Sequence, residues 1–527
     1  MNISWSYSLY VLAERFGDRP AVMDSLDQAL SFNQLNKFAH AVAAKLIALS
    51  IQPGQAIASL LPNSLEAVWT SYGIRLSGAA EIPLSWGYTL DEIQWCETLA
   101  KFEYILTTRS REAELQAMGF RTLCVEAMIA IHHANTIQDV VIDRFPAVRA
   151  ELTGRILFTS GTTGKPKGVT YTHGARWAGE QLLKATLPFF PKPGEKLLLM
   201  TPFVHGASLL TYAWCDYGGT VVLHQGVDTD RISPLLQRGE ITAIFAPPTV
   251  LAKITSAFEG QIFDSIQCVF TGTQPLTAAL YQKASKMFGH NIRVTYGKSE
   301  CVNPITVLDP QATSDYFADQ RNGSGACVGW PAPGVEIKIV QHETTGQVIS
   351  STATEDATDG EIYLRASHMS AGLIDQDGFR PYLPDGWHQT GDLGHFDEQG
   401  RLILTGRVAD VIKTGGYRVN PDEIEAVLAH NPYAAQICVT SIPSDYWGEI
   451  IIAVAESADA RWQNHCQSLL STMSRHKQPR HYLSVDSLPR NPQGKISRKQ
   501  VSKMILQRHQ LKDGPYPELL ALDPQPE

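Results

Sequence analysis

The stretch RILFTSGTTGKPKGVTYTH, residues 155–173, joins two segments of the chain through a polar bend. An apolar run at 156–158 breaks into a loop of hydroxyl side chains, glycines and the ammonium groups of Lys165 and Lys167. Backbone N–H groups in a glycine-rich bend can converge on an anion, and lysines add positive charge. The composition of the loop is therefore compatible with two interpretations, a phosphate-binding loop and a solvated hairpin.

The loop does not follow the P-loop pattern G-x-x-x-x-G-K-[ST]. When the pattern is counted from Gly161, its second glycine falls on Pro166, and Gly168 stands where Ser or Thr is required. Only Lys167 matches. The rest of the chain must therefore decide between the two interpretations.

Size and composition indicate a globular protein with at least two domains. The chain has 527 residues, of which 44% are hydrophobic and 18% charged, and a single core stops growing at about 250–300 residues. The net charge is −9, whereas proteins that bind nucleic acid non-specifically are basic. We therefore expect no nucleic-acid partner. The eight cysteines form no C-x-x-C pair, which favours free thiols in a reducing compartment. We find no signal-peptide pattern and no membrane-spanning apolar run, and we expect a cytoplasmic protein.

Apolar strands alternate with helical patterns along much of the chain. The runs KLLLMTPF (196–203) and TAIFAPP (242–248) predict strands buried on both faces, and PLTAALYQKASKMF (275–288) predicts a helix. Such alternation favours an α/β fold with largely parallel sheets. Ser31 and Gln34 form a capping box that predicts a helix start. Asn420 and Pro421 predict another helix start, with Glu423 reaching back. We expect the Pro-rich acidic end of the chain to be a frayed tail.

Further motifs follow the opening loop in a fixed order: YGKSE at 296–300, TGD at 390–392, GRVADVIKTGG at 406–416 and PRNPQGK at 489–495. Together with SGTTGKPKG at 160–168 they resemble the signature motifs of the adenylate-forming superfamily. That superfamily includes acyl-CoA synthetases, adenylation domains of peptide synthetases and luciferases, and the resemblance is closest to acyl-CoA synthetases. It spans most of the chain and makes the solvated hairpin improbable.

The resemblance implies a two-domain fold. An N-terminal domain, residues 1–407, would hold mainly parallel sheets with helices and a small β-barrel-like subdomain. A small mobile α+β C-terminal domain, residues 408–527, would follow a hinge near 407–410. The C-terminal domain rotates between the two steps of the family's reaction, a hinge movement of a familiar type. Many relatives carry Asp or Lys at the pivot where this chain has Ala409, so we expect altered kinetics of rotation.

The resemblance also implies an enzyme, an AMP-forming acid–thiol ligase. A fatty or aryl acid and ATP would give acyl-AMP and pyrophosphate, and coenzyme A would then give the thioester. The cofactors would be ATP, Mg²⁺ and coenzyme A or a carrier-protein phosphopantetheine. The alternative acceptors are an acyl carrier protein and an amine. A nucleotide-binding regulatory protein is a rival of another class, but every catalytic motif is present. The oligomeric state, monomer or homodimer, stays open.

Site residues follow from the resemblance position by position. Lys495 would bridge the carboxylate and the α-phosphate, Ser299 would donate to that phosphate, and Glu300 would bind Mg²⁺. Tyr296 would stack on adenine, Asp392 would accept both ribose hydroxyls, and Arg407 would approach ribose or phosphate. The full set of expected nucleotide- and pantetheine-binding residues is Thr159, Ser160, Gly161, Thr162, Thr163, Gly164, Lys165, Lys167, Thr273, Gln274, Thr295, Tyr296, Gly297, Asp392, Arg407, Lys413, Gly415 and Gly416.

The residues at 201–208 narrow the choice of the carboxylic acid substrate. His205 falls on the position that lines the acyl pocket in the family, where the competing interpretation is a buried structural histidine. Gly206 falls where enzymes for α-amino acids carry an Asp that pairs with the substrate ammonium. A buried ammonium without a partner would be costly, so an α-amino acid is disfavoured. The small residues here leave room for a fatty or an aryl group, and the sequence does not choose between them.

Overall fold

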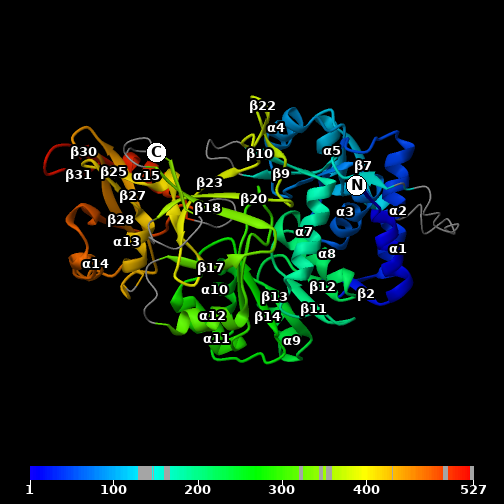
Figure 1. Ribbon diagram of the computed structural model, residues 1–527, viewed down its shortest axis with the longest axis horizontal. Helices are drawn as coiled ribbons and strands as arrows, with labels where there is room; N and C mark the ends of the chain where they lie inside the picture. Colours follow the sequence, from blue (N-terminus) through cyan, green and yellow to red (C-terminus); the bar gives the residue numbers. More distant parts are fainter. Residues whose placement is uncertain are drawn as a thin grey trace. The chain divides into compact units, whose positions relative to one another are not determined.

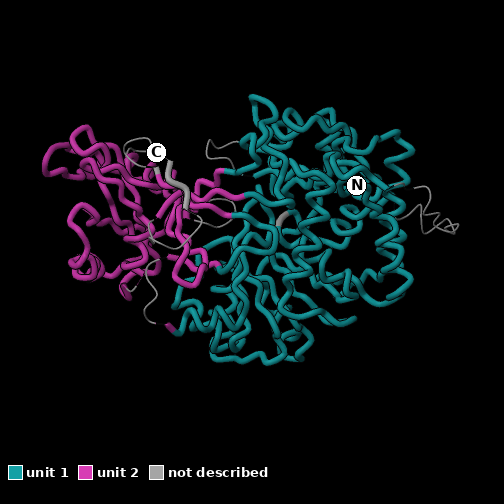
Figure 2. Tube along the Cα trace, in the orientation of Figure 1, with its two compact units in different colours: residues 1–318, 329–336, 365–388 teal, residues 319–328, 337–364, 389–527 magenta. Residues whose placement is uncertain are grey.

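A computed structural model of the chain describes residues 1–128, 145, 147–159, 166–319, 325–342, 348–351, 359–429, 431–490 and 496–522. The chain divides into two compact units (Figure 2). Unit 1 comprises residues 1–318, 329–336 and 365–388, and unit 2 comprises residues 319–328, 337–364 and 389–527.

Unit 1 contains a sheet of eight strands in the order β22-β21-β10-β9-β5-β4-β6-β7. The strands are β4 (Ala56–Leu60), β5 (Ala80–Leu84), β6 (Tyr104–Thr107), β7 (Arg121–Cys124), β9 (Thr153–Thr159), β10 (Lys167–Thr172), β21 (Gly372–Asp375) and β22 (Gly378–Pro381). β7, β6, β4, β5 and β9 run parallel to their neighbours, whereas β9–β10, β10–β21 and β21–β22 are antiparallel. The stretch at 155–173 therefore spans the change from parallel to antiparallel pairing.

A second set of strands in unit 1 has the order β3-β2-β12-β11-β13-β14-β15-β16. They are β2 (Pro20–Asp24), β3 (Ala29–Ser31), β11 (Lys196–Leu199), β12 (Thr220–Leu223), β13 (Ile241–Phe245), β14 (Cys268–Gly272), β15 (Ile292–Tyr296) and β16 (Thr306–Leu308). From β2 to β15 the pairing is parallel. The predicted strands at 196–203 and 242–248 are thus confirmed, although both end before their Pro residues. β1 (Asn2–Ile3) pairs separately with β8 (Val148–Arg149).

Helices pack beside these strands (Figure 1). They are α1 (Trp5–Phe16), α2 (Phe32–Ala48), α3 (Leu65–Ser77), α4 (Leu90–Ala100), α5 (Arg109–Ala117), α7 (His173–Ala185), η2 (Phe203–Ala207), α8 (Ser208–Asp216), α9 (Thr229–Gln237), α10 (Pro248–Ala257), α11 (Ala278–Phe288) and α12 (Pro310–Ala318). The predicted helix within 275–288 is α11. The predicted capping box is also present, because the Ser31 side chain accepts from Gln34 N–H and the Gln34 side chain accepts from Ser31 N–H.

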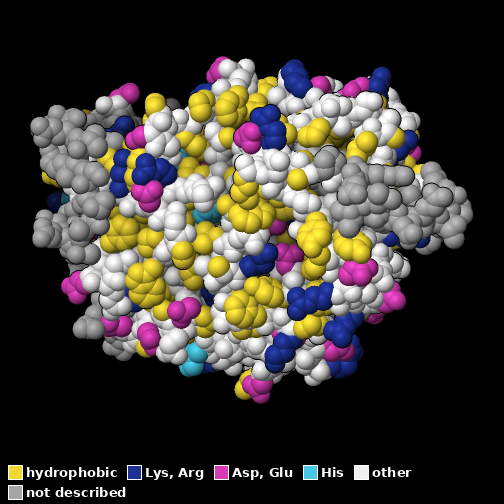
Figure 3. Space-filling view, turned by 45° about the vertical axis from the view of Figure 1, so that its right-hand side comes forward, with side chains coloured by type: hydrophobic (Ala, Val, Ile, Leu, Met, Phe, Trp, Pro, Cys, Tyr) yellow, Lys and Arg dark blue, Asp and Glu magenta, His cyan; other side chains and the backbone are white. Residues whose placement is uncertain are grey.

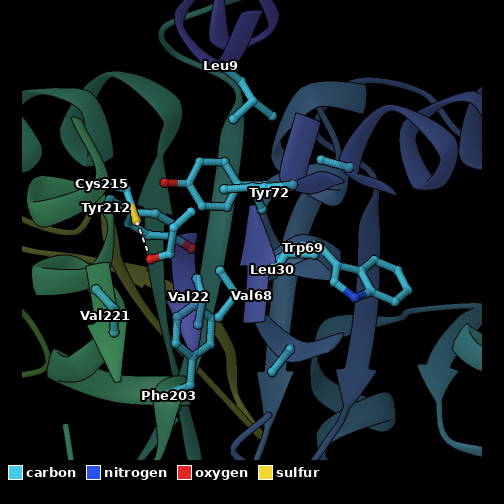
Figure 4. Close-up of a cluster of buried hydrophobic side chains, with 14 of the residues drawn as sticks. Leu9, Val22, Leu30, Val68, Trp69, Tyr72, Phe203, Tyr212, Cys215 and Val221 are labelled. Carbon is cyan, nitrogen blue, oxygen red and sulfur yellow. Dashed lines mark hydrogen bonds between the residues drawn. The ribbon is translucent and has the colours of Figure 1, made fainter. Parts of the chain in front are cut away.

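The core of unit 1 joins helices to the parallel strands. Figure 4 shows Tyr72 of α3 and Tyr212 of α8 above Val22 of β2, with Trp69 of α3 on one side and Val221 of β12 on the other. Tyr72 and Tyr212 meet edge to face with ring centroids 5.1 Å apart, a geometry that aromatic pairs prefer. These side chains hold α3 and α8 against the strands whose ends carry the candidate site.

Unit 2 contains antiparallel strands and a small α+β part. Its strands β19-β18-β20-β23-β24 follow one another in the first sheet, and β26-β25-β28-β27 with β29 form the second. The elements are β18 (Val335–His342), β19 (Val348–Ser351), β20 (Gly360–Ala366), β23 (His388–Phe396), β24 (Leu402–Arg407), η3 (Val408–Asp410), β25 (Ile412–Thr414), β26 (Tyr417–Val419), α13 (Pro421–Leu428), β27 (Gln436–Ser444), β28 (Gly448–Glu456), α14 (Trp462–Leu469), η4 (Leu470–Thr472), η5 (Arg475–Lys477), β29 (His481–Val485), α15 (Arg498–Arg508), β30 (His509–Lys512) and β31 (Glu518–Ala521). β17 (Ala326–Pro331) has residues in both units, and its second half pairs with β16.

Two local predictions in unit 2 need amendment. Asn420 does cap α13, accepting from Asp422 N–H, but Glu423 pairs with Lys477 at 2.6 Å and does not reach back. The expected frayed tail is wrong for residues 513–521. β30 and β31 form an antiparallel hairpin there, and the Asp513 carboxylate accepts from the Ser444 hydroxyl and from Tyr446 N–H. These long-range contacts hold the tail against β27 and its loop.

The cysteine prediction agrees with the structure, since all eight are free and all but Cys124 are buried. Figure 3 shows acidic and basic side chains interspersed on the face it displays. Among the helices that the structure describes, none is long and apolar enough to span a membrane.

Candidate functional site

The opening stretch forms a hairpin. β9 and β10 pair antiparallel from Thr159 opposite Lys167 back to Thr153 opposite Thr172. The indole N–H of Trp95 donates to the Pro166 carbonyl at 2.8 Å, which ties the start of the returning strand to α4. The two strands therefore hold the ends of the predicted phosphate loop. The expected loop residues Ser160, Gly161, Thr162, Thr163, Gly164 and Lys165 lie outside the described residues.

A short turn after β15 carries the predicted Ser299 and Glu300. The Tyr171 hydroxyl of β10 donates to the Ser299 carbonyl at 2.5 Å, and Ser370 N–H donates to the Glu300 carbonyl at 2.9 Å. Lys298 N–H closes the turn on the Cys301 carbonyl at 3.0 Å. Hydrogen bonds from Tyr171 and Ser370 thus fix the backbone of this turn. Tyr171 belongs to β10, the strand that leaves the phosphate loop.

Glu300 is suited to binding a divalent cation. Its side chain is partly buried, and among the described residues no hydrogen bond or ion pair occupies its carboxylate. A carboxylate oxygen is a ligand that Mg²⁺ prefers, and the ion usually completes its shell with water and substrate phosphates. Glu300 therefore fits the expected magnesium ligand, with nucleotide phosphates supplying further oxygens.

Backbone crowding explains two glycines at the ends of β14 and β15. A Cβ on Gly297 would lie 1.9 Å from Asn303 Oδ1, and one on Gly272 would lie 2.4 Å from the Thr295 carbonyl oxygen. Gly297, one of the expected nucleotide-binding residues, therefore has the side-chain amide of Asn303 against it. Tyr296 is nearly buried at the end of β15.

Thr273 has an unusual backbone conformation. Its φ is 68°, in the left-handed region, which is a true outlier for a β-branched residue. Such outliers concentrate at active sites and ligand clamps. Thr273 and Gln274 follow β14, at the same edge of the parallel strands as Tyr296. Their expected role in binding the nucleotide stays a prediction.

In unit 2, Asp392 and Arg407 face each other across β23 and β24. The Arg407 Nε lies 3.3 Å from Asp392 Oδ1, with the guanidinium side chain largely exposed and the carboxylate mostly buried. Asp392 N–H donates to Thr390 Oγ at 3.0 Å, and Thr390 Oγ donates to the Ile362 carbonyl at 2.7 Å. The TGD motif therefore builds a fixed carboxylate with an arginine beside it, a pair that suits a ribose and a phosphate.

Lys413 lies within β25, and Gly415 and Gly416 form the connection between β25 and β26. Both glycines have positive φ, 56° and 84°, where a side chain would be strained. Gly415 N–H donates to the Trp447 carbonyl at 2.8 Å, and the indole ring of Trp447 would lie 3.0 Å from a Cβ at 415. The loop is thus tightly built on the C-terminal sheet. The predicted catalytic Lys495 lies outside the described residues.

A cavity of about 250 Å³ lies in unit 1 beside the segment that carries His205. Phe203 and Val204 of η2 line one wall, and Glu81, Trp86 and His224 line others. The backbone of His205 belongs to the π-helical turn η2, a form often found at functional sites. The side chain of His205 lies outside the described part of the chain, so its expected role is untested.

Sequence reasoning missed residues that hold the motif residues in place. Tyr171 and Ser370 anchor the Ser299–Glu300 turn, and Asn303 packs on Gly297. One signal was available for Tyr171, because Val169 and Tyr171 alternate along β10 and are both buried. Asn303 and Ser370 carry no comparable pattern.

Comparison with known proteins gives matches over nearly the whole chain. The family model described as AMP-binding enzyme matches residues 10–374, and the model described as AMP-binding enzyme C-terminal domain matches residues 423–495. A 2-succinylbenzoate–CoA ligase of Bacillus pumilus is 29% identical over 423 residues, covering 77% of this chain and 81% of that protein.

Solved structures agree. The o-succinylbenzoate CoA synthetase of Bacillus subtilis with its acyl-adenylate intermediate has a TM-score of 0.80 and 26% identity, covering 95% of this chain and 98% of that one. The same enzyme in complex with ATP and magnesium has a TM-score of 0.78 and 25% identity, covering 94% and 99%. The predicted fold, a large α/β N-terminal part and a small C-terminal part, is confirmed.

Proposed function

Since the chain belongs to the family of AMP-binding enzymes, we propose that it joins an aryl carboxylic acid to coenzyme A with consumption of ATP. The predicted resemblance to adenylate-forming enzymes of the acyl-CoA synthetase type is confirmed, as is the class of AMP-forming acid–thiol ligase. The first candidate substrate is 2-succinylbenzoate, the acid named for the relatives. These names favour an aryl acid over the fatty acid that the sequence left open.

One observation carries the proposal most directly. Tyr171 lies on the strand that leaves the phosphate loop, and its hydroxyl holds the Ser299 carbonyl. A single hairpin therefore positions both the loop expected to bind the leaving phosphates and the turn expected to bind the α-phosphate and Mg²⁺. This arrangement suits an attack at the α-phosphate, because groups must meet both sides of the bond that breaks.

The first half-reaction brings two anions together, a carboxylate and the α-phosphate of ATP. Mg²⁺ would supply positive charge to the phosphate oxygens when bound. Ser299 would donate a hydrogen bond to the α-phosphate, and Glu300 would supply a carboxylate oxygen to the ion. In unit 2, the mostly buried Asp392 would accept the ribose hydroxyls while Arg407 holds an oxyanion. Preorganised donors and cations of this kind are usually the largest contribution to such catalysis.

The second half-reaction needs Lys495 withdrawn and a thiol admitted. We propose that residues 1–407 and 408–527 act as the two moving bodies, with the pivot near Arg407 and Ala409. The cavity beside η2 has room for an organic group and supports binding of the acid there. The acceptor we favour is coenzyme A; a carrier-protein phosphopantetheine and an amine are the alternatives. A cytoplasmic location and a monomeric or homodimeric state also remain proposals.

The decisive experiment is carboxylate-dependent exchange of pyrophosphate into ATP. The acids would be 2-succinylbenzoate, benzoate, decanoate and phenylalanine, each with Mg²⁺, and a Glu300→Gln variant would serve as the inactive reference. We expect exchange with 2-succinylbenzoate and none with phenylalanine. Exchange with decanoate alone would overturn the aryl assignment, and no exchange with any acid would overturn the enzyme assignment.

The acceptor is tested in the same mixture by adding coenzyme A, phosphopantetheinyl acyl carrier protein or hydroxylamine, followed by mass spectrometry of the product. We expect the CoA thioester to form faster than the other two products. A faster transfer to the carrier protein would replace coenzyme A as the acceptor.

A further inference from the structure

Five charged side chains, none of them an expected site residue, are buried together in unit 1. They are Arg75 of α3, Glu81 of β5, Arg155 of β9, and Arg176 and Glu180 of α7, and each is at most 6% exposed. Arg75 pairs with Glu180. Arg176 donates to Glu81 at 3.0 Å, and Arg155 Nε lies 3.5 Å from the same carboxylate. Burial opposes ionisation of Glu81, but the two arginines hold its pKa below the ordinary value.

Arg155 differs from the other two arginines because its two Nη atoms donate to the segment 204–208. Its Nη1 donates to the Ser208 hydroxyl at 3.0 Å, and its Nη2 donates to the Val204 carbonyl at 3.2 Å. Val204 and Ser208 stand on either side of His205, at the two ends of the turn that forms η2 and enters α8. One guanidinium therefore forms hydrogen bonds with both ends of the segment expected to line the acyl pocket.

Arg155 also lies on the strand that leads to the phosphate loop. It is four residues before Thr159, the last residue of β9. Glu81, which balances its charge, lines the cavity beside η2 together with Val204. The same side chain thus connects the strand that leads to the phosphate loop, the wall of the cavity and the backbone around His205.

We propose that Arg155 is a positioning residue that sets the binding geometry of the carboxylic acid by fixing the turn from Val204 to Ser208. The proposal rests on the proposed function, since the acid is expected to lie against this turn. A lysine would not reproduce the arginine, because the two hydrogen bonds to Ser208 and Val204 use separate nitrogens of one planar fork. The buried carboxylate of Glu81, whose Oε2 lies 3.5 Å from the Nε, balances the charge of the guanidinium.

The cluster as a whole could be only a support for the fold, as many buried ion pairs are. Two observations argue for a narrower role of Arg155. Arg75 and Arg176 make their contacts with carboxylates and with the carbonyl of Gly154, within the helices and strands of the core. Of these three arginines, Arg155 alone donates two hydrogen bonds to the irregular turn next to the cavity.

The test compares Arg155→Lys and Ser208→Ala with Arg149→Lys, a control whose exposed side chain forms an ion pair with Glu151. Pyrophosphate exchange with 2-succinylbenzoate gives the KM for the acid and for ATP. We expect Arg155→Lys to raise the KM of the acid at least tenfold and Ser208→Ala about fivefold, the effect of one lost hydrogen bond. The KM of ATP should stay within twofold, and the control should match the parent protein.

A double variant separates positioning from general destabilisation. Ser208→Ala should add little to Arg155→Lys, because both remove the same contact. Additive effects, or equal increases in the KM of acid and ATP, would overturn the proposal. An unchanged KM of the acid in Arg155→Lys would do the same.

Hydrogen exchange of the substrate-free protein provides a measurement that does not depend on the proposed reaction. In Arg155→Lys we expect the amides of residues 203–208 to exchange at least tenfold faster, with those of the control variant unchanged. Unaltered protection there would overturn the inference even if the enzyme used 2-succinylbenzoate. Faster exchange together with no turnover of any acid would instead support the inference and count against the proposed function.

Discussion

Glu425 of α13 shares one arginine with two other carboxylates. Arg498 Nη1 donates to Asp410 at 2.8 Å, its Nη2 donates to Glu425 at 2.6 Å, and a further ion pair joins it to Asp422. The second Glu425 oxygen accepts from Val439 N–H at 2.6 Å. Burial raises the pKa of Glu425 to about 7, against the opposing attraction of Arg498. We therefore expect the stability of the protein to depend on pH at this residue.

The sign and size of the effect follow from the two pKa values. The ordinary value is 4.5 and the folded value is about 7, so the folded state binds the proton more tightly than the unfolded chain. The resulting stabilisation is complete below pH 4.5 and is lost as the pH rises through about 7. This difference is worth about 3 kcal/mol, at roughly 1.4 kcal/mol for each pKa unit.

The assay is urea denaturation followed by tryptophan fluorescence in the parent protein and in Glu425→Gln, and Trp462 in the core next to α13 contributes to that signal. We expect the free energy of unfolding of the parent to fall by about 2.5 kcal/mol more between pH 5 and pH 8 than that of the variant. Glu423→Gln is the matched control, because Glu423 lies on the same helix and pairs with Lys477 in a partly exposed site. A variant that kept the full pH dependence of the parent would refute the assignment to Glu425.

Three further predictions test the site. Lys495→Ala should lose about 10²–10³ in the rate of acyl-AMP formation, the scale of one lost oxyanion donor, and should keep thioester formation from preformed acyl-AMP; single-turnover assays in which both steps fall equally would contradict its role. Thr273→Gly should raise the free energy of unfolding by about 1 kcal/mol, because φ of 68° strains a β-branched residue; chemical denaturation that shows a loss would be the opposite result. Gly87→Phe should raise the KM of the acid or of coenzyme A about tenfold through partial filling of the cavity, as a Cβ there meets no atom within 4 Å; unchanged values for both would place the cavity outside the path of either substrate.

Local chemistry made much of the fold predictable. The capping box at Ser31 and Gln34 depends on atoms three residues apart, so the sequence contains the whole interaction. The strands β11 and β13 are apolar runs that end shortly before a proline, and each is buried over most of its length. The tail after residue 512 was predicted wrongly because its partner, the hydroxyl of Ser444, is 69 residues from Asp513. Composition predicts whether a segment can fold alone, and it does not contain such a partner.

The candidate site shows the same difference between local interactions and contacts that are distant in sequence. Motifs predicted which side chains meet the substrates, because that chemistry requires particular groups at particular positions. They did not predict what holds those groups. Tyr171 and Ser299 are 128 residues apart, and Glu81 and Arg176 are 95 apart, so each contact exists only once the strands and helices have assembled.

Buried charged residues show most clearly what a sequence pattern cannot predict. A charged residue between apolar neighbours, such as Arg155 before the run at 156–158, ordinarily indicates an exposed strand face, because an unpaired buried charge is too costly. The cost is offset here by Glu81 from a neighbouring parallel strand and by acceptors on the turn around His205. Loss of either acceptor would leave a buried donor unsatisfied, so the arginine and the turn stabilise one another. A sequence pattern treats each residue by itself, and it therefore cannot distinguish an exposed arginine from one whose partners lie on other elements.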